Sequence, residues 1–117
     1  MPSAPGCEEP TRVLTHPARD EIRLEAVLHA LADPLRLHVV CRLAASDAEI
    51  SCSEFDLEIS KSTSTHHFRV LREAGLIHQH YQGTAKLNRL RREDLDARFP
   101  GLLDAVLSAA QATASAR

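Results

Sequence analysis

The chain has 117 residues, a length typical of one domain, and 44% of them are hydrophobic while only 3% are aromatic. A core built from such a chain must consist of Leu, Val and Ala, which suits packed helices. The formal net charge of −2 is unevenly divided, because seven basic residues and one acid lie within residues 61–92. That segment carries +6 and the remainder −8, which indicates a local surface for phosphate groups on an otherwise acidic protein.

The sequence contains no run of about 20 apolar residues, so it predicts no membrane span. The first ten residues lack the basic and apolar segments of a secretory signal. Three cysteines, an odd number, do not indicate a disulfide framework. We therefore expect a cytoplasmic protein.

Prolines and a glycine within the first ten residues predict a flexible N-terminal arm over residues 1–15. Residues 16–110 are predicted to form one folded domain, and residues 111–117 a flexible tail. The first helix is predicted over residues 20–32, because apolar residues follow the spacing i, i+3, i+4, i+7 there. These residues are Leu24, Val27, Leu28 and Leu31.

The pair Asp33-Pro34 predicts the start of a second helix, with Asp33 as N-cap and Pro34 at the first helical position. This helix is expected to reach about residue 45. Its predicted buried residues are Leu37, Val40, Cys41 and Ala44. After a loop, residues 52–57 are expected to form a short helix whose Phe55 and Leu57 pack beneath the next one.

A third helix is predicted over residues 62–74, because hydroxyl residues favour its start and Gly75 its end. Its polar face gathers hydroxyls, an imidazole and guanidinium groups without a carboxylate, a set that suits phosphate oxygens and base edges in DNA. An ordinary solvent-exposed helix is the alternative. The other face carries Leu71 and Ala74, and we expect His66 to point outward and His67 to be a structural histidine.

Residues 76–90 read as two short strands joined by a turn at Gln82-Gly83-Thr84. A helix, a short turn and a hairpin follow one another in the winged helix-turn-helix order. The phrases STHHFRVLREAGLI and ALADPLRL, at their separation here, resemble the ArsR/SmtB family of bacterial repressors over about residues 20–107. The resemblance implies a mainly α fold of four to five helices with a small β-hairpin wing. It also implies a homodimeric repressor of transcription whose partner is an operator in double-stranded DNA.

The candidate DNA contacts divide into two groups. The candidates for groove contacts are Ser62, Thr63, Thr65, His66 and Arg69. The candidates for phosphates or for the approach of the wing to the minor groove are Arg72, Lys86, Arg89 and Arg91.

The last helical segment begins near Arg91 and is expected to break at Pro100-Gly101. Its apolar stripe is too long for one small domain to cover, so a homodimer is the simplest use of the surplus surface. In the resembling family the terminal helices pair the protomers. The candidate dimerisation residues are Leu24, Val27, Leu28, Leu31, Phe99, Leu102, Leu103, Val106 and Leu107.

The residues that bind metals in the resembling family are mostly replaced by other residue types in this sequence. The cysteine pair of its arsenic and cadmium sensors falls on Ser51 and Ser53, and a neutral serine cannot replace a thiolate on a soft metal. Its zinc sensors use the last helix, which has acids here but no histidine. His78 and His80 lie on one face of a wing strand, but two ligands are too few for a tight structural site. No metal or cofactor is therefore predicted.

The sequence carries no catalytic motif, so we expect no enzyme. Two other readings stay open. The fold could serve a metal- or thiol-responsive sensor that uses Cys7 with Cys52, or Cys41, although Cys41 falls on a predicted core face. It could instead be a protein-interaction module that does not bind DNA, against which the +6 segment argues.

Overall fold

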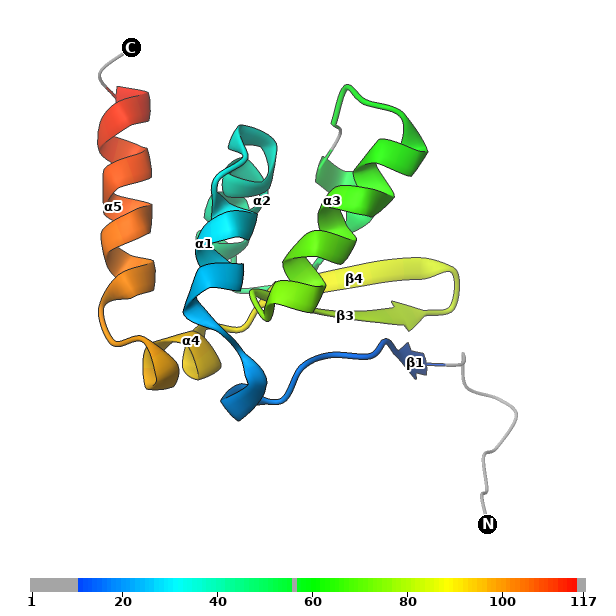
Figure 1. Cartoon of the computed structure of the whole chain (residues 1–117). Coiled ribbons are helices and arrows are strands. Elements are labelled where there is room, and N and C mark those ends of the chain that lie inside the picture. The colour runs from blue at the N-terminus through cyan, green and yellow to red at the C-terminus, as the bar shows by residue number, and fades with distance from the viewer. Residues whose placement is uncertain (1–10, 56, 116–117) are drawn as a thin grey trace.

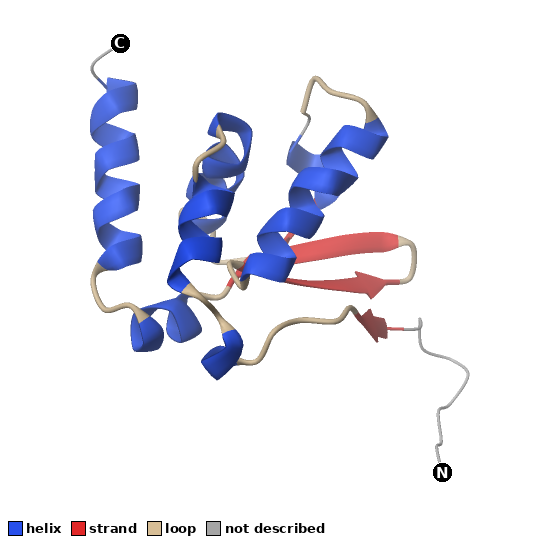
Figure 2. Cartoon of the chain, in the orientation of Figure 1, coloured by secondary structure: helices blue, strands red, loops and turns tan. Residues whose placement is uncertain are grey.

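The computed structural model describes residues 11–55 and 57–115, which form five α-helices and a small antiparallel sheet (Figures 1 and 2). The helices are α1 (Leu24–Leu31), α2 (Pro34–Ala44), α3 (Lys61–Ala74), α4 (Arg92–Arg98) and α5 (Leu102–Ser115). Single 3-10 turns form η1 (Arg19–Glu21) and η2 (Cys52–Phe55). The strands are β1 (Thr11–Val13), β2 (Ile50–Ser51), β3 (Ile77–Gln82) and β4 (Ala85–Leu90), in the order β1-β3-β4-β2. The predicted mainly α fold with a hairpin wing is confirmed.

The hairpin of β3 and β4 pairs Ile77 with Leu90 at its base and Gln82 with Ala85 at its tip. Gly83, in the connecting turn, has a φ of 62°, a conformation that suits glycine. β2 pairs with the outer edge of β4, and β1 pairs with the outer edge of β3. No described helix is long and apolar enough to cross a membrane.

The hydrophobic core lies where α1, α2 and α3 meet the base of the hairpin. Phe68 and Leu71 of α3, Val39 and Val40 of α2, and Ile77 of β3 are at most 1% exposed. Burial of side chains from each of these elements supplies the main favourable free energy of folding. The helix α3 and the hairpin wing are therefore attached to one common core.

The structure differs from the sequence expectations at both ends of the chain. Residues 11–13 form β1, which pairs with β3, so the predicted arm is attached over its last residues. Residues 111–115, expected in a flexible tail, continue α5. Sequence patterns missed both features because a three-residue strand has no periodic signal and an Ala-rich helix lacks a clear end.

Three helical predictions also need local correction. The helix expected over residues 20–32 is divided into η1 and α1 by extended backbone at Ile22 and Arg23. In α2 the buried side chains are Val40 and three residues not predicted, Arg36, Val39 and Leu43, whereas the predicted Leu37, Cys41 and Ala44 are only partly buried. Only a 3-10 turn forms at residues 52–55. The predicted break at Pro100-Gly101 separates α4 from α5.

Gly75 joins α3 to the wing in a conformation that other residues rarely adopt. Its φ is 92°, and a Cβ atom built there would lie 2.6 Å from Cγ1 of the buried Ile22. Glycine is thus required both by the backbone and by the close approach of the segment before α1.

We predict that Gly75→Ala destabilises the protein more than Gly101→Ala. Gly101 also has a positive φ, of 85°, but apart from its chain neighbours no described residue has an atom within 4 Å of the added Cβ. The left-handed backbone costs a non-glycine residue on the order of 1–3 kcal/mol at either position, and only Gly75→Ala adds the clash with Ile22. Denaturant unfolding of both variants measures the difference, and equal losses would contradict the role of Ile22.

The start of α2 gives a pH-dependent prediction. Asp33 accepts hydrogen bonds from the backbone N–H groups of Leu35 (2.9 Å) and Arg36 (3.1 Å), as predicted for an N-cap. These bonds, chiefly that from Arg36, hold the pKa of Asp33 below its ordinary value of 3.8. The stabilisation is therefore complete above that value and is lost as the pH falls through the lowered pKa.

Asp33→Ala should cost about 0.5–2 kcal/mol of unfolding free energy near pH 7, and the difference from the parent protein should narrow below pH 3.8. Asp33→Asn is the matched control, because it keeps an acceptor without a titrating group. Unfolding curves at several pH values measure both, and a difference independent of pH would contradict a role for the carboxylate charge.

Candidate nucleic-acid interface

The helix α3 is held at both ends by caps that its sequence predicted. The Ser60 hydroxyl accepts a hydrogen bond from the backbone N–H of Thr63 at 3.2 Å. At the other end, Gly75 in the left-handed conformation donates its N–H to the carbonyl groups of Leu71 and Arg72. These caps fix the start and the end of the helix.

The two faces of α3 separate as the sequence predicted. Phe68, Leu71 and Ala74 are buried. The five candidates for groove contacts are all exposed on the opposite side: Ser62, Thr63, Thr65, His66 and Arg69. The exposed side carries hydrogen-bond donors and acceptors and one guanidinium, without an acid until Glu73. Such a face can bond base edges and phosphate oxygens.

His67 points inward, as predicted. Its Nδ1 atom lies 3.2 Å from Nη1 of Arg36, and its side chain is 14% exposed. The Arg36 guanidinium is buried and also donates to the carbonyl of Ala30 at 2.8 Å. Arg36 therefore belongs to the internal packing between α1, α2 and α3, a role that the sequence analysis missed.

A hollow of about 600 Å³ separates the first half of α3 from the wing. Lys61, Ser64 and Thr65 line it from the helix, and Tyr81 and Lys86 line it from the hairpin. The Nζ atom of Lys86 lies 5.6 Å from the centre of the Tyr81 ring, which supports the long side chain at the wing. Hydroxyl and ammonium groups thus face a common groove.

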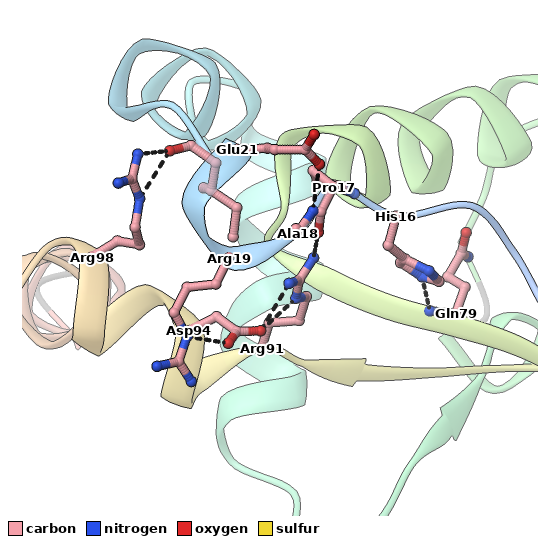
Figure 3. Close-up of polar contacts among 10 residues, drawn as sticks. His16, Pro17, Ala18, Arg19, Glu21, Gln79, Arg91, Asp94 and Arg98 are labelled. Atoms are coloured by element: carbon pink, nitrogen blue, oxygen red, sulfur yellow. Dashed lines mark hydrogen bonds and ion pairs between the residues drawn. The ribbon is translucent and has the colours of Figure 1, made fainter.

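Two of the predicted cationic contacts are engaged inside the protomer. Arg72 donates from Nη1 to Oε1 of Gln79 at 2.6 Å. The Arg91 side chain is 10% exposed, with its guanidinium 2.8 Å from Asp94 and 2.8 Å from the carbonyl of Pro17 (Figure 3). These bonds tie Arg72 and Arg91 into the internal framework, so the DNA contacts predicted for them would compete with these bonds and stay predictions. The contact of Arg91 with Pro17 could not be read from the sequence, because the two residues are 74 positions apart.

The segment before α1 is attached by the same kind of bond. Figure 3 shows Arg19 beside Asp94 and His16 beside Gln79. Arg98 donates to the backbone carbonyl of Ile22. Nε2 of His16 accepts the backbone N–H of Gln79 at 2.9 Å. The N-terminal segment therefore follows the outer edge of β3 from β1 as far as His16.

A buried pair of amides connects α3 to the wing. Gln79 of β3 and Asn88 of β4 are opposite in register and have no exposed surface. Gln79 donates from Nε2 to Oδ1 of Asn88 at 2.7 Å, and Asn88 donates from Nδ2 to the carbonyl of Ile50 at 2.9 Å. The strand alternation could have indicated an inward Gln79, because it shares a face with the apolar Ile77.

The cysteines occupy unreactive surroundings. Burial raises the pKa of the Cys41 thiol and of the Cys52 thiol, so little thiolate forms at neutral pH. Cys52 lies beside Nδ2 of Asn88, at 3.3 Å. Cys7 lies outside the described residues. The hydroxyls of Ser51 and Ser53 are 3.1 Å apart, so the positions of the family's cysteine pair are close together but hold no thiolate.

The outer face of the wing gathers a different set of groups. Ligand atoms of Glu49, His78 and His80 all lie within 4.8 Å of one another. Burial, followed by the positive charge of Arg89, lowers the pKa of His78 to about 4, so its imidazole is neutral at pH 7. The sequence analysis had only the two histidines, since Glu49 comes from a loop before β2.

The candidate dimerisation residues divide by exposure. Val27, Leu31 and Leu103 are buried in the protomer and cannot form an outer surface. Leu24 and Leu28 of α1 are 43% and 46% exposed. The remaining four are partly buried against the core: Phe99, Leu102, Val106 and Leu107. An apolar groove between α2 and α5 adjoins them and includes Leu37, Val106 and Ala110.

Comparisons with known proteins agree with this geometry. Residues 31–80 match the family model described as a helix-turn-helix domain. The uncharacterized HTH-type transcriptional regulator YceK of Bacillus subtilis (strain 168) is 36% identical over 87 residues, which are 73% of this chain and 86% of that protein. The crystal structure of an ArsR family transcriptional regulator, RHA00566, matches with a TM-score of 0.58 and 26% identity, over 80% of this chain and 98% of that one. The chain is thus a transcriptional regulator, not an enzyme, and belongs to the ArsR-like winged helix-turn-helix proteins.

Proposed function

We propose that this regulator is a homodimeric repressor that binds a specific operator in double-stranded DNA without the cysteine metal site of its family. The observation that carries the proposal is the exposed face of α3, where all five groove candidates are accessible and no acid intervenes. The family resemblance supports repression. Insertion of this face into a major groove would bring hydroxyl, imidazole and guanidinium groups to base edges.

The wing supplies the second part of the proposed surface. Lys86 and Arg89 are the wing cations that the protomer does not bury, and the Arg89 side chain is 54% exposed. Lys86, which lines the hollow beside α3, would contact phosphates next to the groove that α3 enters. Arg89 pairs with His78 on the other face of the wing, and its contact would be to phosphate on that side. Because Arg72 and Arg91 are bonded internally, fewer cations contact DNA than the net charge of the segment implies.

The proposed dimer would use the terminal helices. Leu24 and Leu28 of α1 expose apolar surface that no part of the described chain covers. A symmetric pair would present two copies of α3 to half-sites separated by about one turn of DNA, roughly 34 Å. The operator would then be approximately palindromic.

Arg69→Ala should weaken binding to the operator by about 1–3 kcal/mol if the guanidinium reads a guanine. Because the Arg69 side chain is exposed on α3, its removal should leave the folded structure unchanged and weaken only the contact with DNA. Titration of the DNA upstream of the protein's own coding sequence, beside random DNA of equal length, measures the loss on each.

The matched control is Arg23→Ala, which removes another exposed arginine, 69% accessible and outside α3. Equal loss on upstream and random DNA would make Arg69 a phosphate contact. If the parent protein bound neither DNA at any salt concentration, the proposed function would be wrong and the protein-interaction alternative would replace it.

Lys86→Ala should reduce the salt dependence of DNA binding, because a lysine on a phosphate displaces condensed counterions. The slope of log K against log salt should become shallower by about one for each such contact. Titrations at four or more salt concentrations give the slope, and Arg23→Ala should leave it unchanged. A slope equal to that of the parent protein would remove Lys86 from the DNA surface.

A further inference from the structure

We propose that Glu49, His78 and His80 form a binding site for a divalent transition metal of the zinc class, on the face of the wing opposite the recognition helix. The ligand atoms of the three residues lie within 4.8 Å of one another. The site is distinct from the cysteine pair and from the last helix that the family resemblance pointed to. It does not depend on whether the protein binds DNA.

The distances suit a metal after small side-chain rotations. Zinc held at about 2.0–2.1 Å in tetrahedral geometry separates its ligand atoms by roughly 3.3 Å. Nδ1 of His80 and Oε2 of Glu49 are 3.5 Å apart, so this pair already has nearly that separation. The remaining ligand atoms lie within 4.8 Å of one another, so they must approach by at most about 1.5 Å to bind one ion.

The strands hold the two histidines in register. His78 and His80 are alternate residues of β3 and therefore point to the same face of the sheet. Glu49 directly precedes β2, whose Ile50 pairs with Asn88 of β4. Two paired strands and the start of a third thus position the ligands, which makes the site more rigid than one built from loops.

The histidines also lack other partners within the described chain. Nδ1 of His78 and Nδ1 of His80 are buried, and no described protein group hydrogen-bonds either atom. Buried ring nitrogens usually bond a protein group, water or an ion. Nδ1 of His80 faces Glu49, and the rings of His78 and His80 are neighbours whose centres lie 5.6 Å apart.

His16 supports the site without joining it. Its ring stacks on that of His78, with centres 4.5 Å apart and planes at 3°. Its Nε2 atom already accepts the backbone N–H of Gln79. His16 is therefore a positioning residue that fixes the orientation of the His78 ring.

The chemistry of the three groups selects the class of ion. Two imidazoles and a carboxylate suit borderline metals such as Zn²⁺, Co²⁺ and Ni²⁺, whereas arsenite and Cd²⁺ prefer thiolates. Three protein ligands leave one position for water or another group. The Arg89 guanidinium, 4.0 Å from Glu49, opposes a cation, but its side chain is 54% exposed and can turn into solvent.

The test uses the full chain without an affinity tag and freed of metal. Calorimetric titration with Zn²⁺ should give about one ion per chain. Co²⁺ should give the visible spectrum of a four- or five-coordinate ion without a charge-transfer band from thiolate. His78→Ala and His80→Ala should each weaken Zn²⁺ binding by more than the roughly 10–100-fold that loss of a ligand's supporting partner causes.

Two milder variants keep the proposal testable if an alanine variant does not fold. Glu49→Gln removes one charge from an exposed residue and should also weaken binding. Arg89→Gln removes the opposing cation and should tighten it. The matched control, His38→Ala, removes an exposed histidine of α2 and should leave the affinity unchanged.

Two results would overturn the proposal. One is Zn²⁺ binding that survives the combined His78→Ala and His80→Ala substitutions with unchanged affinity and stoichiometry. The other is binding that is lost when Cys7, Cys41 and Cys52 are all replaced by serine, which would assign the metal to thiolates. Because no DNA is present in these measurements, their outcome is independent of the proposed repressor function.

Discussion

The buried amides of Gln79 and Asn88 are the constraint on which the arrangement of wing and recognition helix depends. Each amide is withdrawn completely from solvent, and a buried polar group without a partner costs about 1–3 kcal/mol. The two amides hydrogen-bond one another. Arg72 of α3 donates to Gln79, and Asn88 donates to the carbonyl of Ile50, so the amide groups of both side chains have partners. A shift of the hairpin along α3 would break several of these bonds together.

This constraint has a direct consequence for the surface that faces DNA. The hydrogen bond from Arg72 to Gln79 uses a cation of α3 to orient the wing. Arg91 is likewise bonded inside the protomer, to Asp94 and to the carbonyl of Pro17. The charge of residues 61–92 is therefore partly structural. The cations that stay exposed, among them Arg69 and Arg89, are held on a rigid frame, which favours specific contacts over diffuse attraction.

Local signals in the sequence predicted most of the fold. Asp33-Pro34, Gly75 and the hairpin turn each act within a few residues, so the starts and ends of α2, α3, β3 and β4 could be read directly. The outward face of α3 followed from helical periodicity in the same way. The separation of His66 from His67 is an example, because adjacent helical residues point about 100° apart.

Features that depend on distant partners could not be predicted in this way. An apolar stripe does not reveal which neighbour covers it, so Leu31 and Leu103 were assigned to a dimer surface although the protomer buries them. Arginine composition likewise does not reveal an internal acceptor, as for Arg91 and Pro17. Glu49 lies about 30 residues before His78, and only the pairing of β2 with β4 brings them together.

The alternation of β3 gives its two faces different tasks. Gln79 points toward α3 and fixes the wing, while His78 and His80 point away and meet Glu49. Glu49 is also the described acid nearest to Arg89, at 4.0 Å, so this carboxylate would be shared between a guanidinium and any metal bound at the proposed site. A metal that draws Glu49 toward the histidines weakens its attraction for Arg89, and DNA that draws Arg89 away makes Glu49 a better ligand. By thermodynamic linkage, the two effects must be equal in free energy.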